Sequence, residues 1–179
     1  MHNLQVYRAA VIGAGPAGLA CVGNLLDILP KNEKILWIDP NFCGGRLSSY
    51  PAVPSNTKVC LFTKFAEECQ SFHSGDLKSL KILKEQLDGQ KGCQLKFASE
   101  LCQEITGKLL RNGNLKSIQS TVTSLKYSEQ NGPLWTMETS NDKTIFKSKM
   151  IFLTTGSKPK KLNLPDDFID LDEALKPGI

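Results

Sequence analysis

The feature that most constrains this 179-residue chain is a glycine-rich turn, Gly-Ala-Gly-Pro-Ala-Gly, at residues 13–18. The segment 6–12 before it is short and apolar, which is typical of a strand buried on both faces. After the turn, apolar residues recur at helical spacing from Leu19 to Leu29, and Pro30 is expected to end that helix. A second apolar run follows at 35–38. This order of strand, turn, helix and strand predicts one βαβ unit.

The turn carries the residue types that a pyrophosphate requires. A bound pyrophosphate needs unhindered backbone N–H groups and the positive end of a helix dipole. Gly13 permits a tight turn, Gly15 lets phosphates approach the main chain, and Gly18 lets the helix pack closely on the strand. Proline suits the first helical turn, where its missing N–H has no helical partner. We therefore expect a dinucleotide to bind at Gly13, Gly15, Pro16, Ala17 and Gly18.

An acidic residue follows at the end of the second apolar run. Asp39 lies 21 residues after Gly18, where a carboxylate accepts hydrogen bonds from a ribose diol. An acid at this place disfavours NADP, because it would repel the 2′-phosphate. The alternative is a glycine-rich turn without a ligand, since such motifs also arise by chance. The strand before the turn, the helix after it and the acid together favour dinucleotide binding.

The rest of the chain predicts helices and then antiparallel strands. Residues 42–62 are expected to be mostly loop, and residues 63–113 mainly helical. Strands are expected at 118–127, 134–139 and 144–147, with turns at 131–133 and 141–142, and together they would form a meander. A last buried strand, 150–156, ends on glycine. We predict an α/β fold: a Rossmann-type, mainly parallel sheet flanked by helices, with an inserted antiparallel β-meander. The expected core comprises Val11, Ile12, Leu19, Val22, Leu26, Leu36, Ile38, Ile151 and Leu153.

Three segments, read together, resemble the two-dinucleotide-domain flavoprotein family. They are 11–18, Ile38-Asp39-Pro40 with Gly44-Gly45-Arg46, and 152–156. The family includes pyridine-nucleotide–disulfide reductases and flavin-containing monooxygenases. Its FAD domain opens with the glycine motif, has a double glycine shortly after the acid, inserts a β-meander, and closes on a strand ending in Ala-Thr-Gly or a close relative. The chain shows these features in that order over residues 6–156, with Thr154 in place of the alanine. The resemblance implies that the cofactor is FAD.

The resemblance also assigns further cofactor-binding residues. Val122 matches a valine whose main chain meets the adenine, unless it is simply a core residue. The double glycine would line the pyrophosphate and ribityl region, and Arg46 would reach a phosphate or the flavin edge, unless it is a surface arginine. Residues 50–59 resemble a segment that passes under the flavin in the monooxygenase-like branch. The expected set is Gly44, Gly45, Arg46, Val122, Thr155 and Gly156.

Members of this family continue into a second βαβ domain that binds NAD(P)H. The 179 residues contain neither a second glycine motif of this kind nor a Cys-x-x-Cys pair. We therefore expect residues 1–156 to form an incomplete FAD-binding Rossmann-type domain, and residues 157–179 to form a linker toward an NAD(P)H-binding domain. The chain is expected to be the N-terminal part of a longer FAD-dependent oxidoreductase whose flavin is reduced by NAD(P)H.

Two other functions remain open from the sequence. The chain can be a non-catalytic FAD-binding or regulatory module, because the nicotinamide site is missing from it. It can also be an NAD-dependent dehydrogenase, although the meander interrupts the run of βα units that such an enzyme normally has. No side chain is assigned as a catalytic acid or base. Cys43, the cysteine nearest the expected cofactor, is interpreted as a packing residue rather than a nucleophile.

Composition and charge exclude several other classes. The net charge of +4 comes without a basic stripe or aromatic platforms, so no nucleic-acid partner is expected. The six cysteines and two histidines show no spacing typical of a zinc site, and no metal is expected. No segment reads as a signal peptide or as a membrane span. Free thiols without a secretory signal favour the cytoplasm. The expected partner is a small-molecule dinucleotide, and the sequence names no protein partner.

Overall fold

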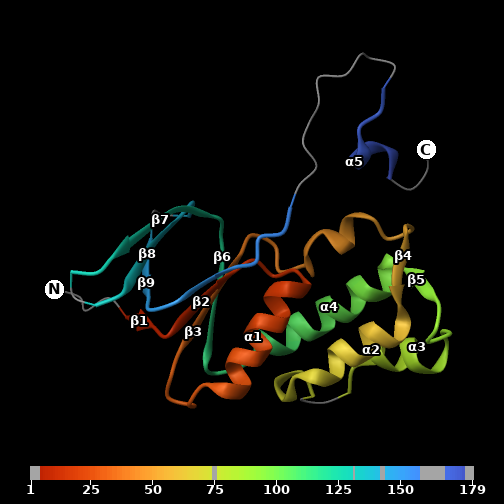
Figure 1. The fold of residues 1–179 in the computed structure, drawn as a ribbon, viewed down its shortest axis with the longest axis horizontal. Coiled ribbons are helices and arrows are strands. Elements are labelled where there is room, and N and C mark those ends of the chain that lie inside the picture. Colours follow the sequence, from red (N-terminus) through yellow and green to blue (C-terminus); the bar gives the residue numbers. More distant parts are fainter. Residues whose placement is uncertain (1–4, 74–75, 131, 142–143, 158–167, 176–179) are drawn as a thin grey trace.

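The computed structural model describes residues 5–73, 76–130, 132–141, 144–157 and 168–175. Within these ranges the chain forms three layers, seen from left to right in Figure 1. The first is a four-stranded sheet that contains the meander, the second is a four-stranded parallel sheet, and the third is a group of helices. The parallel sheet is therefore covered on both faces, as such sheets normally are.

The central sheet has the strand order β10-β2-β3-β6, and every neighbouring pair is parallel. Its strands are β2 (Ala9–Ile12), β3 (Ile35–Asp39), β6 (Leu115–Gln119) and β10 (Ile151–Leu153). The helix α1 (Pro16–Ile28) connects β2 to β3 and confirms the predicted βαβ unit. All of β2 is buried, which explains its continuous apolar sequence. The predicted Rossmann-type parallel sheet is confirmed.

The meander is confirmed too, but two expected strands divide between the sheets. The second sheet has the order β1-β9-β8-β7, with β1 (Val6–Tyr7), β7 (Val122–Ser128), β8 (Leu134–Thr139) and β9 (Ile145–Ser148). The expected strand 6–12 breaks at Arg8: β1 pairs with β9, while β2 joins the parallel sheet. The expected strand 118–127 breaks after Gln119, so β6 pairs with β3 and β7 pairs with β8. Alternation predicts which face a residue occupies, but it does not predict which sheet a strand joins. The expected turn residues 131 and 142 lie outside the described residues.

The segment 42–62 is more ordered in structure than the predicted loop. It contains η1 (Gly45–Ser49), β4 (Pro54–Lys58) and the first residues of α2 (Val59–Glu68). The strand β4 pairs with β5 (Gly92–Gln94) in an antiparallel ribbon. Its sequence, Pro-Ser-Asn-Thr-Lys, has no apolar alternation, and its partner lies more than thirty residues away. The sequence therefore offered no local signal for this strand.

The helical layer follows the predicted pattern. It contains α1, α2, η2 (Gln70–Phe72), α3 (Lys78–Glu85) and α4 (Leu95–Leu109), and a short helix α5 (Leu171–Ala174) lies near the C-terminus. Figure 1 shows α1 and α4 next to the parallel sheet, with α2 and α3 farther out. In α4 one face is buried and includes Leu101, Ile105 and Leu109. One apolar cluster lies between these helices and the sheet, and a second lies between the two sheets.

Most of the expected core is buried. Leu26 and Ile151 are only partly buried, although both pack against a core cluster. The expectation for Leu153 was wrong, since its side chain is 64% exposed. Leu153 ends β10, which is an edge strand, and its side chain lines the cavity described below.

Candidate functional site

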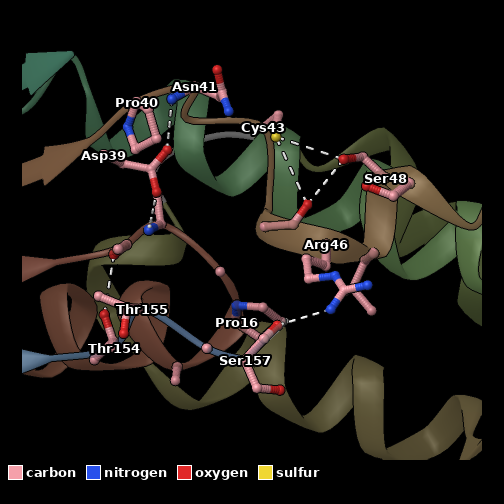
Figure 2. Close-up of a pocket in the computed structure, with 18 of the residues that line it drawn as sticks. Pro16, Asp39, Pro40, Asn41, Cys43, Arg46, Ser48, Thr154, Thr155 and Ser157 are labelled. Carbon is pink, nitrogen blue, oxygen red and sulfur yellow. Dashed lines mark hydrogen bonds between the residues drawn. The ribbon is translucent and has the colours of Figure 1, made fainter. Parts of the chain in front are cut away.

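A cavity of about 940 Å³ opens at the carboxyl ends of β2, β3 and β10. Its lining comes from three stretches that are far apart in the sequence, 13–17, 39–50 and 153–157, and from Leu171. Figure 2 shows Pro16, Asp39, Arg46 and Thr154 around this space. Ligands of open parallel sheets bind outside the carboxyl ends of the strands, so the position is that of a ligand site.

The three glycines of the motif differ in what the fold demands of them. Gly13 has a φ of +112°, and a Cβ added there would lie 2.4 Å from the carbonyl oxygen of Thr154. A Cβ on Gly18 would lie 2.1 Å from the carbonyl oxygen of Gly13. At both positions the folded chain itself excludes a side chain, and Gly18 does not line the cavity.

Gly15 is different, because the fold leaves room for a side chain there. Its φ of −78° and ψ of −176° are extended backbone that any residue adopts. A Cβ added to Gly15 would meet only the Cα of Gly45, at an ordinary 3.8 Å. Packing within the described chain therefore does not require glycine at this position. A group that approaches the main chain from the cavity would require it.

The amino end of α1 faces this cavity without a side-chain cap. Gly15 is the N-cap residue, Pro16 begins the helix, and no acidic residue lies in the first turn. Pro16 and Ala17 both line the cavity. Within the described residues the Gly15 N–H makes no hydrogen bond to the chain. The unpaired N–H groups and the helix dipole make this a place that favours an anion.

Asp39 connects the glycine turn to the loop after β3. Its Oδ2 accepts a hydrogen bond from the Ala14 N–H at 2.8 Å. Its Oδ1 accepts from the N–H groups of Asn41 and Phe42 at 2.8 and 2.7 Å. A carboxylate has about four acceptor sites, so Oδ2 keeps one that is free to receive a hydroxyl. Asp39 therefore lies in the cavity wall at the end of β3, and its hydrogen bonds hold the neighbouring residues of that wall in place.

The opposite wall begins at the double glycine. Gly44 and Gly45 have φ angles of +79° and +74°. A Cβ on Gly44 would lie 3.0 Å from the Cβ of Cys102 in α4, and Gly44 does not line the cavity. Gly45 does line it, and a Cβ there would lie 2.8 Å from the Cα of Gly15. The two glycine-rich segments therefore touch, and this contact fixes the spacing of the two walls.

Arg46 extends from this wall toward the C-terminal segment. Its guanidinium donates to the carbonyl oxygen of Ser157 at 2.9 Å and pairs with Asp172 at 2.7 Å. It also donates to the hydroxyl of Tyr50, and that hydroxyl donates to Asp172. The hydrogen bond to Asp172 raises the pKa of the Tyr50 phenol above its usual value. The sequence singled out Arg46, but nothing in the pattern pointed to Tyr50 or Asp172 as its partners.

Only some of the remaining predicted residues line the cavity. Thr155 and Gly156 line the cavity, as does Thr154 before them. Val122 does not; it begins β7 and packs against the cluster between the two sheets. Of the segment 50–59, only Tyr50 lines the cavity, while residues 54–58 form β4.

Titratable groups suited to acid–base chemistry are scarce in the cavity. Cys43 lines it and accepts a weak hydrogen bond from the Ser48 hydroxyl at 3.6 Å. All six cysteines are free, and burial raises the pKa of Cys102 to about 12.

Among the described residues there is no group of three or more His, Cys, Asp or Glu side chains that could hold a metal. None of the described helices is long and apolar enough to cross a membrane.

Comparison with known proteins decides the family. The sequence model described as pyridine nucleotide-disulphide oxidoreductase matches residues 7–176. The chain belongs to this family. It is also 36% identical over 192 residues to the monooxygenase AgnR1 of Paecilomyces divaricatus, in an alignment that covers 99% of the chain and 48% of that protein. The chain thus spans about half the length of this relative.

Solved structures show the same fold. OTEMO, in a complex with FAD and NADP, superposes with a TM-score of 0.64 at 18% identity and covers 90% of this chain and 28% of that one. An oxidised steroid monooxygenase bound to NADP gives a TM-score of 0.59 at 15% identity, over 85% of this chain and 26% of that one. At these identities the likeness concerns the fold, and it supports the layered arrangement of the two sheets and the helices.

Proposed function

We propose that this chain binds FAD in the cavity at the carboxyl ends of β2, β3 and β10. The observation that carries the proposal is Gly15, which lines the cavity although its conformation and surroundings tolerate a side chain. Glycine is explained there by a ligand that approaches the main chain. The uncapped amino end of α1 next to it favours a negatively charged ligand such as a pyrophosphate.

The lining residues fit the parts of FAD. The N–H of Gly15 and the first-turn N–H of Ala17 would hold the pyrophosphate. The free acceptor site of Asp39 Oδ2 would receive a ribose hydroxyl. Gly45 and Arg46 would border the pyrophosphate from the opposite wall, and Thr155 and Gly156 would close the site. Val122 and Gly44 stay in the proposed set only through their main chains, since their side-chain positions face away from the lining.

We further propose that the chain is the FAD-binding part of a monooxygenase-type oxidoreductase whose flavin is reduced by NAD(P)H. FAD supplies the electron chemistry, and this chain binds it, orients it and excludes water around it. The likeness to a monooxygenase, over about half of that protein, supports this type. A disulfide reductase would need a pair of cysteines at the flavin. Among the described cysteines, Cys43 alone lines the cavity.

The proposal divides the chain at the end of the sheet. Residues 1–156 would form the FAD-binding domain, and residues 157–179 would lead toward an NAD(P)H-binding domain of a longer polypeptide. In support, β10 ends at Leu153, the next residues line the cavity, and α5 is joined to the cavity wall through Arg46. Six free cysteines fit a reducing compartment, and we propose the cytoplasm.

The first test uses the 179-residue chain itself. The purified protein should show a flavin absorption spectrum, or acquire one with added FAD, and chromatography of the released cofactor should identify FAD. Gly15→Ala should weaken FAD binding at least ~10-fold, because the new methyl group occupies the space that the phosphates need. Gly107→Ala is the matched control. Gly107 lies in α4, and a Cβ added there would meet nothing within 4 Å.

Two outcomes would overturn the proposal. One is a colourless wild-type chain that takes up neither FAD nor an FAD analogue at millimolar concentration. The other is a Gly15→Ala variant that binds FAD as tightly as the Gly107→Ala control. Binding of NAD with turnover of a substrate in the absence of flavin would instead favour a dehydrogenase.

A further inference from the structure

The peptide unit that joins Gly13 to Ala14 is held at both of its polar ends by β3. The Gly13 carbonyl accepts a hydrogen bond from Trp37 Nε1 at 2.9 Å, and the Ala14 N–H donates to Asp39 Oδ2 at 2.8 Å. Between them, the carbonyl of Ile38 accepts from the Gly13 N–H at 2.8 Å. Three consecutive residues of β3 therefore hold the turn: Trp37 and Asp39 through their side chains, and Ile38 through its main chain.

Trp37 is well placed to act as a fixed donor. Its side chain is fully buried, and its ring packs edge-to-face against Phe42 with centroids 4.9 Å apart. An indole N–H in such a place must be paired, and the Gly13 carbonyl is the partner the structure gives it. The hydroxyl of Thr154 lies 3.2 Å from the same carbonyl and 2.9 Å from that of Ile12. The Gly13 carbonyl is thus bonded from β3 and from the residue after β10, the two strands that lie on either side of β2.

The orientation of this peptide matters for an anion in the cavity. Gly13 has a φ of +112°, a region that glycine enters easily, so its own backbone restrains the orientation of the peptide after it only weakly. A rotation would turn the carbonyl oxygen, with its partial negative charge, toward the cavity. It would also break the hydrogen bond from Ala14 to Asp39. Phosphates beside Gly15 would then meet a repelling dipole rather than N–H groups alone.

We propose that Trp37 is a positioning residue for the phosphate-binding turn. Together with Asp39 it locks the Gly13–Ala14 peptide so that the Gly13 carbonyl stays buried against β3 and away from the bound dinucleotide. The inference rests on the proposed FAD function and extends it to a residue outside the glycine motif. In this inference Asp39 both receives the ribose and holds the Ala14 N–H. Thr154, which stands where the family usually has alanine, supplies a second donor to the Gly13 carbonyl.

The chain offers a matched pair of variants, since it contains two tryptophans. Trp37→Phe keeps an aromatic ring but removes the N–H, whereas Trp135→Phe makes the same change in the meander, where the ring packs at a tilt against Tyr127. Two quantities are measured on each variant: the Kd for FAD, and the hydrogen exchange of the Ala14 amide relative to the Val11 amide in β2. Trp37→Phe should raise the Kd about 10-fold and speed Ala14 exchange about 10-fold more than Val11 exchange, as expected for the loss of one buried hydrogen bond.

The exchange measurement separates this inference from the proposed function. If the wild-type chain does not bind FAD, the proposed function fails, while Ala14 exchange in the ligand-free chain still decides whether Trp37 locks the turn. Equal acceleration of Ala14 and Val11 in Trp37→Phe, or an effect of the same size in Trp135→Phe, overturns the inference. If Trp37→Phe does not fold, exchange of the Trp37 indole N–H in the wild-type chain is the test: it should be slower than that of the Trp135 indole N–H, and equal rates overturn the inference.

Discussion

The two walls of the cavity are built in different ways. The first wall, residues 13–17 with Asp39, is held by main-chain groups and buried side chains within one βαβ unit. The second wall, residues 45–50, is joined to α5 by exposed polar side chains; those of Arg46 and Asp172 are 37% and 57% exposed. Buried hydrogen bonds are costly to leave unpaired, while exposed ion pairs contribute little. The first wall is therefore a fixed feature of the fold, whereas the contact between the second wall and α5 can break without unfolding the domain.

A comparison of two glycines within the first wall tests this view and has the largest expected effect. Gly13→Ala should lower the free energy of unfolding by about 3 kcal/mol, because it combines a strained φ with a clash against the backbone. Gly15→Ala should change the free energy of unfolding by less than about 1 kcal/mol, because its extended backbone suits alanine. Urea denaturation followed by circular dichroism measures both.

The pair separates folding from binding on a single turn. Gly13→Ala should lose FAD because the turn is lost, whereas Gly15→Ala should lose FAD while remaining folded. If both variants unfold equally easily, Gly15 is required by the fold, and the reason given for its role as a ligand contact disappears.

The second wall responds to removal of its ion pair by a smaller, local change. Arg46→Ala should speed hydrogen exchange in the segment 171–175 about 3-fold, because an exposed pair of this kind contributes roughly 0.2–1 kcal/mol. The free energy of global unfolding should stay within about 0.5 kcal/mol of the wild-type value. Lys126→Ala is the control, since Lys126 forms a similarly exposed pair with Glu138 in the meander. Unchanged exchange at α5 in Arg46→Ala would show that other contacts hold this segment.

The sequence predicted the first wall because its signals are local. The glycines and the acid are spaced along one apolar strand–helix–strand pattern, and that pattern alone brings Asp39 next to the turn. The second wall depends on Arg46 meeting Asp172, 126 residues later in the chain. No periodicity links two side chains at that separation, so the contact with Asp172 was not expected. Tyr50 was expected near the flavin as the first residue of the segment 50–59, but not as a partner of Arg46.

The errors in the fold have a related cause. The segments 6–12 and 118–127 were each expected to be one strand, and each divides between two sheets. Alternation reports which side chains face inward, and a strand that passes from one sheet to the next keeps that alternation. Trp37 is a single-residue example of what a sequence pattern does not reveal. As a buried aromatic side chain in an apolar strand it looks like an ordinary core residue, and only the structure shows its N–H on the Gly13 carbonyl.

The smallest expected effect is a pH dependence confined to the second wall. The hydrogen bond to Asp172 raises the pKa of Tyr50, so the folded form favours the neutral phenol. A group with a raised pKa stabilises its contacts below the unfolded value, and that stabilisation is lost as the pH rises through the folded value. The contact between Tyr50 and α5 should therefore be intact below about pH 10 and weaken above it.

Hydrogen exchange is too fast to follow at that pH, so limited proteolysis in the segment 171–175, between pH 8 and 11, is the suitable measurement. The wild-type segment should become more susceptible above about pH 10. Tyr50→Phe should be more susceptible at pH 8 and show little further change. Tyr127→Phe is the control, because the hydroxyl of Tyr127 bonds to Glu129 in the meander and also has a raised pKa. If Tyr50→Phe loosens with pH just as the wild type does, the titrating group lies elsewhere, and the second wall is held by Arg46 and Asp172 without help from the phenol.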